Sequence, residues 1–184
     1  MKNSISYYSK EQIIARVDRQ GNVIGKIEKW EAHEKGILHR GFAIILLYKN
    51  YILLQHRKHP AFDGVFDVTS SSHQLFVGGV LQDTLDAVYG TLKRELNLDK
   101  KDLTGIPKED GAIYYKARDQ FSEFIEHEYC YIYSVAVKNL PAPNLDFAYG
   151  YSLISKEELL NKNSRTYKNL APWVKKMIEK KLIK

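Results

Sequence analysis

Two glutamates in the segment EHEYCYIY are the first side chains of this sequence that could do chemistry. Glu126 and Glu128 are two residues apart, so in an extended strand they point to the same face, roughly 7 Å apart. A divalent cation between them could bind both carboxylates, and one carboxyl group could also move a proton. Alternation alone leaves open whether this face points inward or to solvent. Cys130 and Ile132, on the same face, favour the inward placement.

Another carboxylate, Glu95, falls on the apolar side of a predicted helix. It lies seven residues after Val88 and three after Leu92, which places it above both at 3.6 residues per turn. A carboxylate aimed at a core is costly unless it is paired or binds a metal. Two arrangements meet this condition: an ion pair with an arginine or lysine at the edge of the core, and a metal site. The residues alone do not distinguish between these two arrangements.

Three histidines could add imidazole ligands to these carboxylates. His33 and His39 flank the turn EKGIL, and His73 follows a run of small residues, 69–72. The three lie in distant segments and match no compact metal-binding motif. A lone histidine is more often structural, so this pattern indicates only that buried acids and histidines are available.

Hydrophobic periodicity predicts the elements that must position these side chains. Strands are expected at 13–18, 23–28, 42–48, 51–57, 65–71, 112–118 and 126–137, with a turn at Lys49-Asn50. A short irregular or helical piece should end at Gly36. The clearest helix covers 82–98, where Leu81, Leu85, Val88, Leu92 and Leu96 recur at steps of three and four.

The C-terminal part of the chain predicts two more helices. SKEELLNKN carries Ser155 as N-cap and Glu158 at the third helical position. A last helix is expected within 165–184, from about Tyr167 to Lys184. Strands, a helix, more strands and closing helices predict an α+β fold or an α/β/α sandwich. The length of 184 residues fits one domain over 1–184, with 1–9 as a loose lead-in.

Composition narrows the class of protein. A single cysteine excludes a disulfide framework and a thiolate zinc site, and it is typical of a reducing compartment. No apolar run approaches the roughly 18 to 20 residues of a membrane span, and MKNSISYYSK lacks the apolar core of a signal peptide. We therefore expect a cytoplasmic protein with no integral membrane association.

The net charge of +6 is concentrated at one end of the chain. The last ten residues, KKMIEKKLIK, hold five lysines and one glutamate, which leaves +2 for the rest. This pattern favours the solvated face of a C-terminal helix. Because no nucleic-acid-reading motif accompanies the charge, we expect no nucleic-acid partner.

Several segments, taken in order, resemble a known family. From Val17 to about Ala136 the chain is similar to type I isopentenyl diphosphate isomerases of the Nudix superfamily. FDVTSSSH resembles the strand with that family's catalytic cysteine and following histidine. DAVYGTLKREL resembles its reduced Nudix helix, and EHEYCYIYSV its paired-glutamate strand. The resemblance implies a Nudix-type α/β/α sandwich with a mixed sheet.

The resemblance also implies binding sites for metals and for a small diphosphate substrate. One divalent ion, Zn²⁺ or Mn²⁺, would be bound by His33, His39, His73, Glu126 and Glu128. Glu95 would help to hold a Mg²⁺ that neutralises the diphosphate, and Lys29 and Arg57 would contact that diphosphate.

The implied reaction is isomerisation of a C=C bond in isoprenoid biosynthesis. Glu128 would add or remove a proton, assisted by Tyr115, and Ser71 stands where the family has its cysteine. Trp173 would lie over the developing carbocation, whose positive charge an aromatic face attracts. The pocket must hold little water, because water would capture the carbocation.

Four departures from the family pattern stand beside the resemblance. Ser71 replaces the catalytic cysteine, and a hydroxyl is far less acidic than a thiol. Gly90-Thr91 stands where the Nudix helix should carry an arginine for the diphosphate. The loop QLFVGGVLQDT is longer than usual. HRKHPAFDG is shorter, with Lys58 or His59 as the candidate substitute for a missing basic residue.

Two alternatives to the isomerase follow from these departures. Nudix hydrolases use the helix motif G-x5-E-x7-R-E-U-x-E-E, and Arg94-Glu95-Leu96 fits its R-E-U core. The later glutamate pair is Leu98-Asp99, which weighs against ordinary hydrolysis of another diphosphate. The second alternative is a non-catalytic paralogue that retains the metal site for a structural role.

Overall fold

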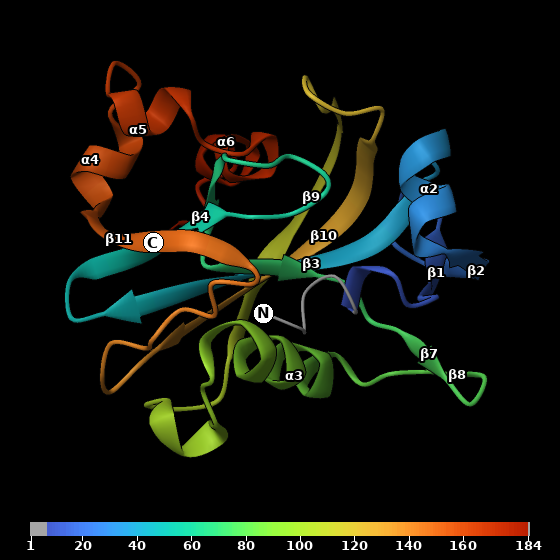
Figure 1. Cartoon of the computed structure of the whole chain (residues 1–184), viewed down its shortest axis with the longest axis horizontal. Coiled ribbons are helices and arrows are strands. Elements are labelled where there is room, and N and C mark those ends of the chain that lie inside the picture. The colour runs from blue at the N-terminus through green and yellow to red at the C-terminus, as the bar shows by residue number, and fades with distance from the viewer. Residues whose placement is uncertain (1–6, 184) are drawn as a thin grey trace.

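The computed structural model describes residues 7–183 and contains a nine-stranded mixed sheet (Figure 1). Its central strands follow the order β11-β4-β3-β1-β2, and β10 pairs with β3 and β9. Among the described residues, β10 and β3 form the only parallel pair of neighbouring strands in this sheet. The strands are β1 (Ile13–Val17), β2 (Val23–Glu28), β3 (His39–Tyr48), β4 (Tyr51–Arg57), β5 (Phe66–Val68), β6 (Ser70–Ser72), β9 (Lys108–Arg118), β10 (Ile125–Ala136) and β11 (Ala148–Ser155).

Helices cover both faces of this sheet (Figure 1). They are α2 (Lys29–Lys35), α3 (Thr84–Leu96), the short 3-10 turn η1 (Lys100–Asp102), α4 (Lys156–Leu160), α5 (Arg165–Lys168) and α6 (Pro172–Glu179). A separate small hairpin consists of β7 (Phe76–Val77) and β8 (Val80–Leu81). The α+β class and the layered Nudix-type sandwich that the sequence predicts are confirmed.

The central strand β3 carries the two hydrophobic cores on its two faces. Ala43 and Ile45 pack in the core beneath α6, whereas Ile44 and Leu46 pack in the core beneath α3. A strand buried on both faces reads as a continuous apolar run, which is why FAIILLY shows no polar alternation. The sheet is therefore held rigidly between two layers, and its strand ends can carry a site.

Helix α3 follows the apolar periodicity of the sequence closely. The Asp83 side chain caps its N-terminus by accepting hydrogen bonds from the backbone N–H groups of Leu85 and Asp86. Asn97, with φ 53°, ends it in the left-handed conformation. Val88 and Leu92 are buried against the sheet, and Glu95, one turn further on, is buried as well.

The C-terminal region differs from the single long helix that the periodicity predicts. Pro172 has no backbone N–H and biases Ala171 to an extended conformation, so α5 ends at Lys168 and α6 starts afresh. The intervening residues bond instead to β5, through Phe66 N to Asn169 O and Ala171 N to Phe66 O. The expected helix from Tyr167 to Lys184 is wrong in extent, and Lys184 lies outside the described residues. This break places Trp173 in the first turn of α6.

Two further differences concern segments for which no element was predicted. Strand β11 pairs along β4 as an edge, and β7 with β8 forms the small hairpin.

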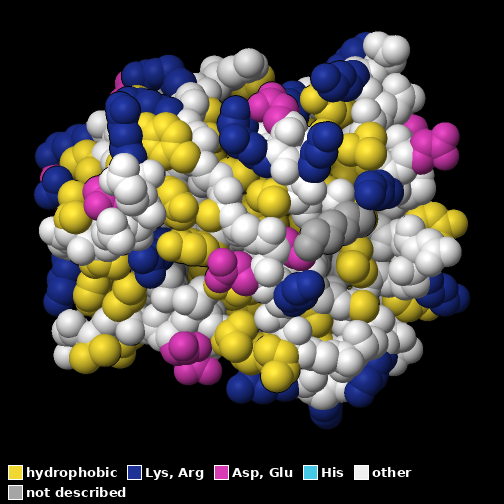
Figure 2. All heavy atoms as spheres, turned by 180° about the vertical axis from the view of Figure 1, so that it is seen from behind, with side chains coloured by type: hydrophobic (Ala, Val, Ile, Leu, Met, Phe, Trp, Pro, Cys, Tyr) yellow, Lys and Arg dark blue, Asp and Glu magenta, His cyan; other side chains and the backbone are white. Residues whose placement is uncertain are grey.

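Most of the expected lead-in, residues 1–6, lies outside the described part, while Tyr7 and Tyr8 pack over the sheet. No helix in residues 7–183 is long and apolar enough to cross a membrane. On the face seen in Figure 2, Lys and Arg side chains are scattered rather than gathered in one stripe.

Candidate active site and metal centre

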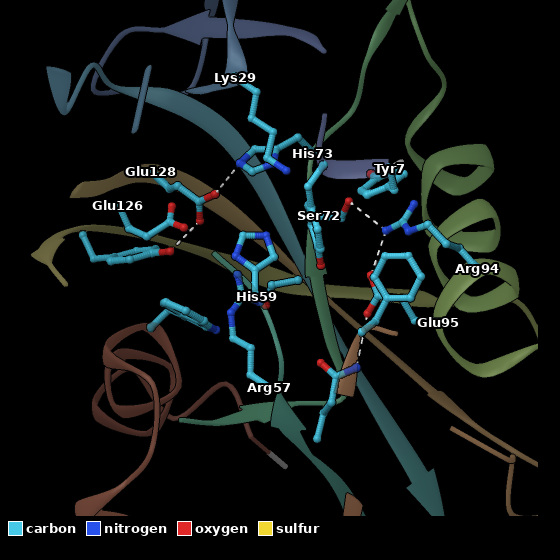
Figure 3. Close-up of a pocket in the computed structure, with 16 residues that line it drawn as sticks. Tyr7, Lys29, Arg57, His59, Ser72, His73, Arg94, Glu95, Glu126 and Glu128 are labelled. Carbon is cyan, nitrogen blue, oxygen red and sulfur yellow. Dashed lines mark hydrogen bonds and ion pairs between the residues drawn. The ribbon is translucent and has the colours of Figure 1, made fainter. Parts of the chain in front are cut away.

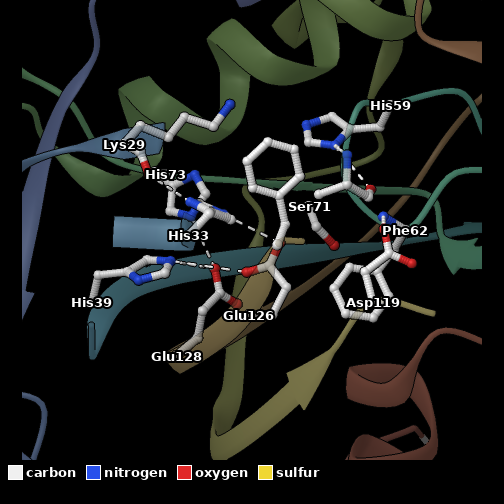
Figure 4. Close-up of polar contacts among 12 residues, drawn as sticks. Lys29, His33, His39, His59, Phe62, Ser71, His73, Asp119, Glu126 and Glu128 are labelled. Carbon is white, nitrogen blue, oxygen red and sulfur yellow. Dashed lines mark hydrogen bonds and ion pairs between the residues drawn. The ribbon is translucent and has the colours of Figure 1, made fainter. Parts of the chain in front are cut away.

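Five side chains from four parts of the chain meet at one end of β3 and β10 (Figure 4). They are His33 on α2, His39 at the start of β3, His73 just after β6, and Glu126 and Glu128 on β10. The ligand atoms of the three histidines and Glu126 all lie within 4.8 Å of one another. Glu128 Oε1 lies 3.0 Å from His73 Nε2 and 3.6 Å from His39 Nε2.

The parallel pairing of β10 with β3 creates this meeting point. Its register sets Glu128 opposite His39 and Cys130 opposite Gly41. The Glu128 carboxylate lies over Gly41, so that a Cβ added there would overlap it. Along β10, Glu126, Glu128 and Cys130 are buried, which confirms the inward placement that Cys130 and Ile132 favoured.

Backbone carbonyls orient two of the imidazoles. His33 Nδ1 lies 2.6 Å from Lys29 O, and His39 Nδ1 lies 2.7 Å from Ile37 O. A carbonyl only accepts, so each Nδ1 carries the proton and each Nε2 presents a lone pair to the cluster. This is the arrangement in which histidine binds a metal.

The residues present fit a divalent cation. Nε2 of all three histidines and Glu126 Oε2 are buried and form no hydrogen bond in the described structure. His33 Nε2 lies only 3.2 Å from Glu126 Oε1. Buried acceptors that face one another are costly without an electrophile between them, and native proteins pair such groups. A metal ion bound by these nitrogens and oxygens satisfies the whole set.

Electrostatics favour the metal-binding forms of His73 and Glu128. Burial lowers the pKa of His73 to about 4, so its imidazole is neutral at neutral pH. Burial alone would raise the pKa of Glu128, but the adjacent imidazoles of His39 and His73 hold that pKa well below its usual value. A neutral imidazole beside an ionised carboxylate is the donor pair that a divalent ion requires.

Tyr115 connects the metal centre to an adjoining cavity. Its hydroxyl donates to Glu128 Oε2 over 2.6 Å, and burial raises the pKa of Tyr115 well above its usual value. The Trp173 ring lies 6.0 Å from the Tyr115 ring, and both line the cavity. This end of the cavity therefore combines a proton-sharing pair with an aromatic surface.

Ser71 lines the same cavity and is bonded to a carboxylate that the sequence reading missed. Its hydroxyl donates to Asp67 Oδ2 over 2.9 Å, and Trp173 Nε1 donates to Asp67 Oδ1 over 2.6 Å. Arg57 Nη1 also reaches Asp67 Oδ2, at 3.3 Å. The segment FDV has the pattern of an ordinary strand. The acidic residue inside this strand was the only signal in the sequence that it could have a functional role.

Positively charged side chains line the same cavity from several sides (Figure 3). Lys29 and Arg57 both line it and are buried, which brings together two residues expected to contact a diphosphate. Burial, with the nearby Arg57 charge, lowers the pKa of Lys29 to about 8. Lys29 Nζ lies 4.5 Å from the centre of the Trp30 ring and forms no ion pair with a carboxylate of residues 7–183.

Arg94 is a third cation in the cavity lining, and the sequence analysis assigned it no role in binding the diphosphate. Its Nη2 lies 2.8 Å from Glu95 Oε1, 3.3 Å from Thr91 Oγ1 and 3.4 Å from Ser72 Oγ. Arg94 follows Thr91 by three residues, so both share one face of α3. That spacing was the available signal, because an arginine was expected near Gly90-Thr91.

Glu95 and Lys58 take positions different from those implied by the resemblance. Both oxygens of Glu95 are partnered, one by Arg94 and the other by Gln55 Nε2 at 3.3 Å. Lys58 points away from the cavity, where its Nζ donates to Leu145 O over 3.0 Å. His59, the other candidate substitute, does line the cavity.

Aromatic residues close the cavity on its remaining side. Tyr7 and Tyr8 lie over it together with Phe147, and the Arg94 guanidinium lies 4.3 Å from the centre of the Tyr7 ring. Trp30 Nε1 donates to Tyr8 O over 2.9 Å, which ties the covering segment to α2. The space left is about 20 Å³, room for roughly one water molecule.

Comparisons with solved structures agree with this architecture. A Deinococcus radiodurans protein superposes with a TM-score of 0.61 at 16% identity, covering 82% of this chain and 88% of its own. A MutT NUDIX hydrolase from Burkholderia pseudomallei superposes with a TM-score of 0.56 at 15% identity, covering 77% of this chain and 96% of its own. At such identities the likeness shows a Nudix-type fold.

Sequence relatives are more specific, although no family model matches the chain. Isopentenyl-diphosphate Delta-isomerase 1 of Mesocricetus auratus is 34% identical over 191 residues, which cover 91% of this chain and 81% of the relative. Isopentenyl-diphosphate delta-isomerase 2 of Homo sapiens is 28% identical over 92% of this chain and 82% of its own length. Isomerase 2 of Photorhabdus laumondii is 28% identical, covering 91% of both chains. The chain belongs to the isopentenyl-diphosphate delta-isomerase family.

Proposed function

We propose that this protein converts isopentenyl diphosphate and dimethylallyl diphosphate into one another. The observation that supports this most strongly is that one buried cavity combines positive charge with an aromatic, proton-sharing surface. Lys29, Arg57 and Arg94 line the cavity and supply the positive charge. Trp173 and the hydrogen-bonded pair of Tyr115 and Glu128 line the same cavity. A short alkenyl diphosphate has the matching polarity, with a charged head and an apolar reacting tail.

The cationic side chains of the cavity would bind the diphosphate and so fix the position of the double bond. Lys29 and Arg57 are buried, so their charges act through little water and interact strongly with an anion. Arg94 adds a planar guanidinium suited to paired phosphate oxygens. Binding of the diphosphate by these side chains would place the alkene carbons between Glu128 and Ser71.

Isomerisation then requires a proton added at one end of the alkene unit and another removed on its far side. The Tyr115 hydroxyl donates to Glu128 Oε2, both residues line the cavity, and we assign this pair to protonation. The Trp173 face stabilises the tertiary carbocation that results. Proton removal falls to the side occupied by Ser71. Because the cavity is about 20 Å³ with Tyr7 and Tyr8 over it, these residues would have to move to admit the substrate, and their return would exclude the water that would otherwise capture the cation.

The metal centre would be formed by His33, His39, His73, Glu126 and Glu128. Three imidazoles and two carboxylates suit a borderline ion, and we propose Zn²⁺ or Mn²⁺. When bound, the ion would supply positive charge that holds both carboxylates in place.

The residues around Glu95 do not fit the expected Mg²⁺ in the same way. Arg94 lies 2.8 Å from one carboxylate oxygen, where a cation would otherwise sit, and Gln55 partners the other. We therefore derive no step through Mg²⁺ and assign neutralisation of the diphosphate to the three cationic side chains. Lys58 has no part in this assignment.

An assay of two products tests the proposal. Metal-loaded protein is incubated with isopentenyl diphosphate, and dimethylallyl diphosphate and released phosphate are both measured. Isomer without phosphate is expected. Phosphate release would instead identify a hydrolase, and tight metal binding without either product would identify a non-catalytic relative. Glu128→Gln should abolish isomerisation, whereas Glu123→Gln, exposed on the loop before β10, should leave it unchanged.

A further inference from the structure

Asp67 is a fully buried carboxylate that none of the roles above uses. It lies on β5 with 0% exposure, and the cavity lining does not include it. Its two oxygens receive hydrogen bonds from Ser71, Trp173 and Arg57. Two of these donors, Ser71 and Trp173, themselves face the reacting end of the cavity. Asp67 therefore lies directly behind the place where a proton must leave the substrate.

The direction of the Ser71 hydrogen bond determines what that hydroxyl can do. Because Ser71 donates its proton to Asp67 Oδ2, its oxygen lone pairs remain free on the cavity side. A serine hydroxyl alone is a weak base and acid, and it becomes competent only when an adjacent group takes its proton. Asp67 is that adjacent group.

We infer that Asp67 and Ser71 together form a carboxylate–hydroxyl relay that takes the place of a thiol in proton removal. The inference rests on the proposed isomerase function and deepens it. Ser71 is the catalytic residue, since it faces the substrate. Asp67 acts through Ser71 and is a positioning and proton-accepting residue behind it.

The relay balances as one concerted transfer. The substrate C–H bond breaks, and its electron pair becomes the new C=C bond. The released proton forms a new O–H bond on Ser71 Oγ, while the original Ser71 O–H bond breaks and that proton passes to Asp67 Oδ2. In the reverse direction, protonated Asp67 returns its proton to Ser71 as Ser71 protonates the alkene. No oxidant, reductant or second substrate is required.

The charges around Asp67 suit such a transfer at neutral pH. Burial raises the pKa of Asp67 to about 6, while Arg57 on β4 and hydrogen bonds from Trp173 and Ser71 limit that rise. Glu95 on α3 raises the pKa further, and Cys130 on β10 faces the same carboxylate. An acceptor with a pKa near the working pH exchanges protons in both directions most efficiently.

A purely structural role for Asp67, as partner of buried Arg57, makes a different prediction. The Arg57–Asp67 contact is 3.3 Å, longer than the bonds from Ser71 and Trp173. If the contact only held Arg57 in place, loss of Asp67 would raise KM for the diphosphate, whatever residue occupies position 71. In the relay, loss of Asp67 lowers kcat, and the loss depends on the residue at 71.

Four variants compared with wild type distinguish these roles: Asp67→Asn, Ser71→Ala, Ser71→Cys and the double variant Asp67→Asn/Ser71→Cys. Asp67→Asn and Ser71→Ala should each lower kcat about 100-fold, with KM within about threefold of wild type. Ser71→Cys placed on Asp67→Asn should raise kcat at least about tenfold, since a thiol exchanges protons unaided. The acid limb of kcat near pH 6 in wild type should disappear in Ser71→Cys. Bound metal and thermal midpoint are measured for every variant.

The results that would overturn the relay are separate from failure of the proposed function. A wild-type protein that forms no isomer refutes the function itself. With an active wild type, the relay is refuted if Asp67→Asn retains over a third of kcat, or if Ser71→Cys brings it no recovery. Should Asp67→Asn not fold, Ser71→Ala decides alone, and retention of a third of kcat in that variant refutes the relay.

Discussion

Arg94 reaches the cavity from the C-terminal half of α3 and contacts Ser72, Thr91 and Glu95. The position expected to carry a cation, Gly90-Thr91, has no charge, but the next turn of the same helix face supplies one. A long guanidinium side chain can span that one-turn displacement. At the residue scale, we therefore expect Arg94 to take over the role of the missing side chain.

Arg94→Gln should raise KM for isopentenyl diphosphate about 10- to 100-fold, because a charge-assisted hydrogen bond contributes about 1.5–3 kcal/mol. The kcat should change little, since Arg94 lies away from the reacting carbons. Lys93→Gln is the matched control on the exposed side of α3, where Lys93 pairs with Asp99. Steady-state kinetics of both variants test this, and equal KM values would remove Arg94 from the binding site.

At the scale of elements, the pairing of β3 with β10 positions the metal centre, and Gly41 permits it. Glu128 crosses above Gly41, at a place where any side chain would displace the carboxylate. Gly41 has no positive φ, so backbone strain is not the reason for a glycine here. The requirement comes from the close approach of Glu128.

Gly41→Ala should therefore weaken metal binding and lower kcat while the protein remains folded. A methyl group at this position pushes the Glu128 carboxylate away from His39 and His73. Gly25→Ala on β2, where an added Cβ meets nothing within 4 Å, is the control. Metal content after dialysis, with circular dichroism for the fold, measures the effect. Metal retention equal to that of Gly25→Ala would contradict it.

Elements with regular periodicity could be predicted from the sequence, and those defined by distant contacts could not. Cys130 and Ile132 on the same face of β10 favoured an inward placement of Glu126 and Glu128, and the 3.6-residue pattern located α3 to within two residues at each end. The break before Pro172 depends on bonds to Phe66, far away in the chain. Asp67 likewise gains its partners from α6 and β6, so no local pattern reveals them.

At the scale of the whole molecule, the metal centre joins α2, β3, β10 and the segment after β6, so an ion bound there should stabilise the fold. Removal of divalent ions by a chelator should lower the thermal midpoint by roughly 5–10 °C, the equivalent of about 2.7 kcal/mol at a hundredfold excess over Kd. Glu126→Gln should lose most of this response, and Glu123→Gln should retain it. Differential scanning calorimetry measures the shift, and an unchanged midpoint would argue against a metal centre.

Buried Asp67 should leave a signature in the pH dependence of unfolding. Its pKa rises from 3.8 to about 6 on folding, so between these values the unfolded state loses the proton first. The free energy of unfolding of wild type, relative to Asp67→Asn, should therefore fall as pH rises from 4 to 6. The slope approaches about 1.4 kcal/mol per pH unit. Urea titrations at half-unit intervals measure it.

The control for that experiment is Asp86→Asn, an exposed position on α3. Its stability relative to wild type should not follow the same trend between pH 4 and 6. A constant difference between wild type and Asp67→Asn over this range would mean that Asp67 ionises alike in both states. Burial of the carboxylate would then have no energetic consequence.

The parallel pairing of β3 with β10 also has a consequence for the kinetics of folding. The two strands are separated by β4, β5, β6, α3 and β9 along the chain, so their contact closes a long loop, and such non-local pairing forms slowly. Glu128 meets His39 only when that loop has closed. During refolding, metal capture should therefore lag behind helix formation, and the uptake of an ion would report when β10 pairs with β3.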